Sequence, residues 1–65
     1  MKVAVASIDP TKVIKLFESW GAAKQYAVDN PDHFVSVSLH EDESAAIAFA
    51  NELHEMTPEW SLELL

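Results

Sequence analysis

Residues 33–56 read HFVSVSLHEDESAAIAFANELHEM and carry two different periods of apolar residues, one after the other. Over 33–40, apolar and polar side chains alternate, and this period of two predicts a half-buried strand whose apolar face is Val35, Val37 and Leu39. From 43 to 56 the apolar residues recur at intervals of three and four, which predicts an amphipathic helix. Its buried stripe comprises Ala46, Phe49, Ala50 and Leu53. A strand followed directly by a helix is therefore the centre of the chain's second half.

Both ends of this helix carry boundary signals. Asp42 stands at the N-cap position, where its carboxylate can accept a hydrogen bond from a free amide of the first turn. Glu41 and Glu43 add negative charge near the positive end of the helix dipole. Thr57-Pro58 ends the helix, and the alternation of Trp60, Leu62 and Leu64 with polar residues predicts a short last strand over 60–64.

The first half of the chain predicts a hairpin and a shorter helix. A valine-rich run, 3–8, and a second β-like run, 12–17, are separated by the turn signature Asp9-Pro10-Thr11, so they are expected to pair as a β-hairpin. One face of this hairpin would carry Val3, Val5, Ile14 and Leu16. A helix is predicted over 20–29, capped by Ser19 and ended by Asn30-Pro31. Its packing side would comprise Ala23, Tyr26 and Ala27.

These elements predict a single α+β domain over 1–65, in the order β-β-α-β-α-β. Sixty-five residues are enough for one small core only. We expect a small mixed sheet with both helices on one face and a right-handed second crossover. Because the chain has no cysteine, apolar packing or a partner must stabilise it without disulfides.

The formal charge of −7 is distributed unevenly along the chain. Residues 1–24 contain all four lysines and two carboxylates, whereas residues 25–65 contain nine carboxylates and no lysine. Such a field repels phosphates and anionic lipid and attracts basic surfaces. We therefore expect neither direct nucleic-acid binding nor membrane binding.

The sequence carries no signature of an enzyme, a metal site or a cofactor site. The histidines His33, His40 and His54 lack the spacing of metal ligands, and the strand period should point the first two to opposite faces. The single glycine, Gly21, cannot build a phosphate-cradling loop, and no serine stands in a nucleophile elbow. We expect no catalytic residue, metal or cofactor.

The start lacks a secretory signal and no apolar run reaches ~20 residues, which favours the cytoplasm.

A binding module for a basic surface is the function that the charge favours. The candidate partner-binding residues are Glu41, Asp42, Glu43, Glu52, Glu55, Glu59 and Trp60. From Asp42 to Glu55 a regular helix would span about 20 Å, a length over which carboxylates could imitate the phosphates of a few base pairs. The alternatives are that the acids only cap the helix and keep the chain soluble, and that Trp60 belongs to the core.

In its size and in its acidic stretch 29–63, the chain resembles the very small acidic inhibitors of phages and plasmids, including anti-CRISPR proteins and DNA mimics. The resemblance rests on these two features and on no motif. It implies an inhibitor that binds an effector complex and blocks its target DNA. The residues that would carry this activity are Glu41, Asp42, Glu43, Glu52, Glu55 and Glu59.

A second hypothesis is a self-associating accessory domain. The alternating residues 60–64 would form an exposed strand edge, which could pair with another copy. The sequence thus leaves a monomer and a homodimer open.

Overall fold

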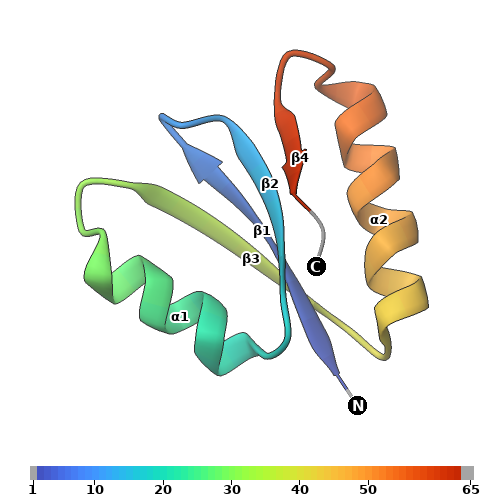
Figure 1. The fold of residues 1–65 in the computed structure, drawn as a ribbon, viewed down its shortest axis with the longest axis horizontal. Coiled ribbons are helices and arrows are strands. Elements are labelled where there is room, and N and C mark those ends of the chain that lie inside the picture. Colours follow the sequence, from blue (N-terminus) through green and yellow to red (C-terminus); the bar gives the residue numbers. More distant parts are fainter. Residues whose placement is uncertain (1, 64–65) are drawn as a thin grey trace.

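The computed structural model describes residues 2–63. It contains β1 (Val3–Asp9), β2 (Val13–Phe17), α1 (Trp20–Asp29), β3 (Phe34–His40), α2 (Glu43–Met56) and β4 (Ser61–Glu63) (Figure 1). The order β-β-α-β-α-β and the α+β class predicted from the sequence are confirmed. The last position of the predicted strand 60–64 lies outside the described residues.

The helix boundaries follow from the capping residues. The Oγ atom of Ser19 accepts a hydrogen bond from the Ala22 amide at 3.1 Å, and Asp42 Oδ1 accepts one from the Ala45 amide at 2.8 Å. Each side chain therefore satisfies an amide that has no partner within its helix. Among the described residues, neither helix is long and apolar enough to cross a membrane.

The strands form a mixed sheet in the order β3-β1-β2-β4. The predicted hairpin is confirmed, because β1 pairs antiparallel with β2 from Ala4↔Phe17 to Ile8↔Val13. On its other side β1 pairs antiparallel with β3, and β4 pairs parallel with β2. The strand nearest the N-terminus, β1, thus lies inside the sheet, between β3 and β2.

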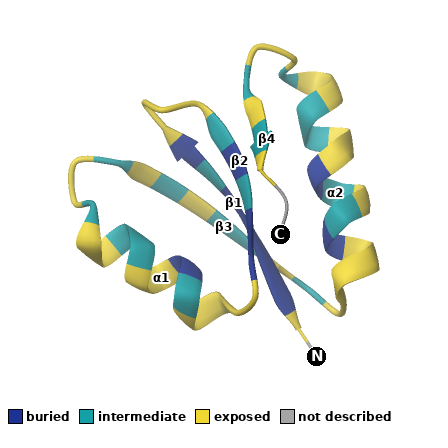
Figure 2. Ribbon diagram, viewed as in Figure 1, coloured by how far each residue is buried: buried dark blue, intermediate teal, exposed yellow. Residues whose placement is uncertain are grey.

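β1 is buried along most of its length (Figure 2), and its alternate residues belong to core clusters on opposite faces of the sheet. Val3 and Val5 belong to one core cluster, which also contains Ile14 and Leu16 of β2 and Ala46 and Ala50 of α2. A second cluster, on the other face, comprises Ala4, Ala6, Ile8, Phe17 and Ala23 of α1. Both helices contact the sheet through buried alanines, and these small side chains allow each helix to pack closely on its face.

The prediction that both helices share one face is wrong: α1 and α2 cover opposite faces. The physical reason lies in the strand order. Because β2, β3 and β4 run parallel to one another, α1 and α2 each belong to a parallel crossover. The first crossover runs from β2 to β3 and the second returns across the whole sheet from β3 to β4. Two crossovers in opposite directions keep the same hand only when their helices lie on opposite faces.

The close approach of α2 yields a stability prediction. Ala50 is fully buried against the sheet, whereas Ala48 on the same helix is exposed. Ala50→Leu should lower the free energy of unfolding by about 1–3 kcal/mol through overpacking. Ala48→Leu, with the same change in volume and little change in helix propensity, should stay within ~0.5 kcal/mol. Urea unfolding followed by circular dichroism measures both, and equal effects would contradict the packing of α2.

Candidate functional site

The acidic residues predicted to bind a partner gather on one layer of the molecule. We call α2 with its two flanking loops, residues 41–60, the α2 layer. It holds six of the eleven carboxylates and none of the four lysines, which places −6 of the formal −7 on this layer. All six of these carboxylate side chains are exposed. They are Glu41, Asp42, Glu43, Glu52, Glu55 and Glu59.

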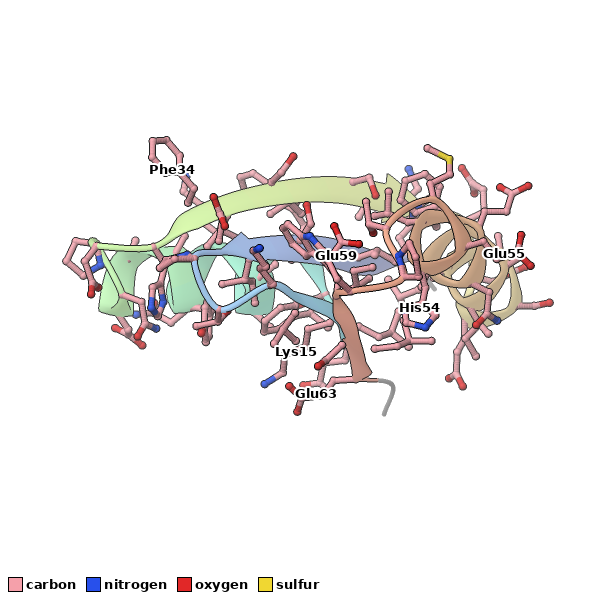
Figure 3. The ribbon with its side chains drawn as sticks, turned by 90° about the horizontal axis from the view of Figure 1, so that it is seen from above. Lys15, Phe34, His54, Glu55, Glu59 and Glu63 are labelled. Atoms are coloured by element: carbon pink, nitrogen blue, oxygen red, sulfur yellow. The ribbon has the colours of Figure 1, made fainter. Side chains whose placement is uncertain are left out.

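Within the α2 layer the acids spread around the helix rather than along one line. Glu52 and Glu55 are three residues apart and thus about 60° apart around the helix axis. Both lie outside the stripe that carries the buried Ala46 and Ala50, and Figure 3 shows Glu55 on the outer side of α2. Glu43 lies in the first turn, on the opposite side of the axis from Glu52. A partner would therefore meet a convex acidic surface.

Asp42 has a structural role in addition to its charge. Its hydrogen bond to the Ala45 amide starts α2, so the capping interpretation applies to this residue. Its neighbours Glu41 and Glu43 are exposed, and Glu43 lies in the first helical turn, near the positive end of the helix dipole. The negative charge at this end of α2 thus stabilises the helix, whether or not it also contacts a partner.

Two lysines are held on the opposite side of the sheet. The ammonium of Lys15 lies 5.4 Å from the ring centre of Phe17 and 5.7 Å from that of Tyr26, and Lys24 Nζ lies 4.9 Å from the ring of Trp20. These cation–π contacts keep both charges on the α1 side. On the same side of the sheet, Lys15 of β2 is the register partner of Glu63 of β4.

The other two lysines lie at the borders of the α2 layer. Lys2 precedes Val3, which pairs with His40 next to the start of the layer. Lys12 accepts a hydrogen bond through its backbone carbonyl from the Ser61 amide at 2.9 Å, just beyond the other end of the layer. The backbone positions of these two lysines are thus next to the two ends of the α2 layer.

The two tryptophans differ from each other in exposure. Trp60, a candidate partner-binding residue, is half-buried and packs against the core cluster under α2. Its position favours the interpretation as a core residue. Trp20 at the start of α1 is 48% exposed instead, and no feature of the sequence singled it out as the more accessible indole.

A groove of about 170 Å³ lies between α2 and the strands β1 and β3. Its apolar lining includes Val5, Phe49 and Leu53, and its polar lining is Ser7, Ser36 and Ser38. This groove was not predicted from the sequence, in which its only signal was the serines Ser36 and Ser38 on one face of 33–40.

A serine–histidine contact lies beside the groove. The Oγ atom of Ser38 lies 2.9 Å from His40 Nε2, and the His40 ring packs on Phe49 at 4.7 Å between centres. Nucleophilic catalysis requires in addition a group that orients the histidine and donors for an oxyanion. No carboxylate is among the groove-lining residues. The contacts of Ser38 and His40 are therefore a hydrogen bond between their side chains and the packing of the imidazole on Phe49.

His33 and His40 lie on opposite sides of the sheet, as the strand period predicts. His33 stacks on Tyr26 of α1 at 6.2 Å between ring centres, whereas His40 packs on α2. Within residues 2–63, no group of three potential metal ligands comes together.

The chain matches no protein-family model, no curated protein and no solved structure.

The double role of Asp42 can be separated by substitution. Asp42→Ala removes the cap and should lower the free energy of unfolding by about 1 kcal/mol. Asp42→Asn retains a side-chain oxygen that accepts the Ala45 amide, so it should cost markedly less. Glu41→Ala, which removes a neighbouring charge outside the helix, is the control and should stay within about 0.5 kcal/mol. Thermal and urea unfolding test this order; a loss for Asn as large as that for Ala would contradict the capping role.

Proposed function

We propose that the protein is a non-enzymatic binding module whose α2 layer docks on a basic surface of a partner protein or nucleoprotein complex. The observation that carries the proposal is the exposure of six carboxylates on one layer that contains no lysine. Basic groups on a partner would find no competing cation among residues 41–60. The resulting field would steer encounter and raise the association rate at low salt.

A nucleic-acid-binding site is the basic surface that this layer fits best. The fourteen residues of α2 extend about 21 Å, and one DNA strand presents a phosphate every ~3.4 Å of helix axis. The acidic layer thus has the length of a few base pairs and the same sign of charge as DNA. In this proposal the protein is an inhibitor that occupies the site in place of DNA, as an anti-CRISPR protein or a DNA mimic would. The protein itself would not bind nucleic acid.

Charge reversal on α2 tests the docking surface directly. Glu52→Lys/Glu55→Lys should weaken binding to an oligoarginine peptide by about tenfold, equivalent to ~1.4 kcal/mol. The matched control, Glu18→Lys/Asp32→Lys, changes the net charge by the same amount at exposed positions outside the α2 layer. The control should keep most of the affinity, measured by titration calorimetry at low salt. Equal losses in both variants would show that only net charge matters and would contradict a localised surface.

The nature of the partner is tested by competition. Immobilised wild-type protein should retain nucleic-acid-binding proteins from a bacterial lysate, and duplex DNA should release them. The Glu52→Lys/Glu55→Lys variant should retain less of the same proteins, while the control variant retains them. Retention that is indifferent to duplex DNA and to charge reversal would rule out occupation of a nucleic-acid site.

A further inference from the structure

The outer edge of β3 is an open strand edge. β3 is the first strand in the order β3-β1-β2-β4, and in Figure 3 it lies along the top of the sheet with no described element beyond it. Sheet proteins usually protect such an edge with charged residues, proline, a bulge or a very short strand. β3 has seven residues, FVSVSLH, without an acidic residue, lysine, arginine, proline or glycine. The opposite edge differs, because the described β4 has three residues and ends in Glu63.

Apolar side chains on β3 are also exposed. Phe34 is 83% exposed, and in Figure 3 its ring projects outward beyond the open edge. Leu39, near the other end of the strand, is 47% exposed. An exposed phenylalanine and an exposed leucine thus stand at the two ends of an edge that no charge or proline protects, which leaves the strand open to pairing.

The sequence of β3 complements itself when it is reversed. If two copies of Phe34–His40 pair antiparallel with Val37 at the centre, Val37 meets Val37 and Ser36 meets Ser38. In the same register Val35 meets Leu39, and Phe34 meets His40. The valine, serine and valine–leucine pairs then join side chains of like chemistry, and Phe34 with His40 joins two aromatic rings. Cross-strand pairs on the same face of the sheet stabilise strand pairing.

We propose that β3 pairs with β3 of a second copy, antiparallel about a two-fold axis at Val37, so that the two sheets become continuous. Charge favours this edge over the rest of the surface. Asp32 and Glu41 flank the strand, and the eight residues between them include no carboxylate. Two copies of a chain with a net charge of −7 can therefore meet along β3 without placing carboxylates within the paired strands.

The area involved predicts a weak dimer. Seven residues extend about 24 Å, and layers on either side of the sheet lie ~10 Å away, so the footprint is about 24 by 20 Å. Both copies together would bury on the order of 1,000 Å², the lower limit of specific interfaces. We therefore expect a dissociation constant of about 10–100 μM.

Sedimentation velocity across protein concentrations around this range tests the dimer. The wild type should change from monomer to dimer, and Phe34→Lys should weaken association at least tenfold because it places a charge at each end of the paired strands. Met56→Lys is the matched control, since Met56 is an apolar side chain that is 75% exposed and belongs to α2, not to β3. The control should associate like the wild type. A monomeric wild type at millimolar concentration, or equal losses in the two variants, would overturn the proposal.

The absence of native cysteine allows the register to be tested by cross-linking. Val37→Cys should give a covalent dimer with a short bismaleimide, because the two-fold axis brings the two copies of residue 37 together. Ser61→Cys places the same group on the exposed β4 edge and should react far less. A dominant Ser61→Cys cross-link would overturn pairing through β3 in favour of the C-terminal strand, and efficient cross-linking of neither would overturn strand pairing.

The effect of salt distinguishes self-association through β3 from the binding of a basic partner by the α2 layer. Raising ionic strength from about 0.01 to 0.15 M shortens the Debye length from ~30 to ~8 Å. Self-association should strengthen, because carboxylates flanking the paired strands repel one another less. Binding to oligoarginine through the α2 layer should weaken over the same range. Self-association that weakens with salt would contradict the uncharged β3 contact, whatever the outcome of the oligoarginine titration.

Discussion

The structure depends on one central strand that is buried on both faces. Val3, Val5 and Ile8 of β1 are at most 8% exposed, and the alanines between them are fully buried. A strand of this kind must be covered on both sides, because leaving either face in water would forfeit much of the apolar burial on which so small a domain depends. α1 covers the alanine face and α2 covers the valine face. The three-layer arrangement follows from this requirement together with the hand of the two crossovers.

The separation of charge follows from the separation of the helices. Because α2 lies on its own face, the carboxylates of residues 41–60 form a layer apart from α1. On the other face, aromatic rings of β2 and α1 hold the ammonium groups of Lys15 and Lys24. Had both helices shared one face, Lys24 and the acids of α2 would belong to the same surface. The fold therefore gives an acidic chain one surface that is almost free of cations, and leaves the uncharged edge of β3 between the two helical layers (Figure 3).

Local chemistry in the sequence was sufficient to predict the elements but not their arrangement. Ser19 and Asp42 marked the first residues of the helices because capping depends on neighbouring residues. The strand order was not predictable in this way, since the pairing of β1 with β3 joins residues 25 to 37 positions apart. The run VAVASI did contain the signal that β1 is buried on both faces, but apolar residues at successive positions can equally be read as one face of a hairpin. For the candidate site, residue counts were sufficient to identify the acidic stretch, whereas the exposure of Trp60 and Trp20 depended on tertiary packing.

The most direct test of this account is whether the two helices contact alternate residues of β1 in solution. Nuclear Overhauser contacts between methyl groups measure this without any substitution. Ala23 should show contacts to Ala6 and Ile8, and Ala46 and Ala50 should show separate contacts to Val3 and Val5. Contacts from Ala23 and Ala46 to the same side chains of β1 would contradict it, because both helices would then share one face and the acidic layer would not be separate.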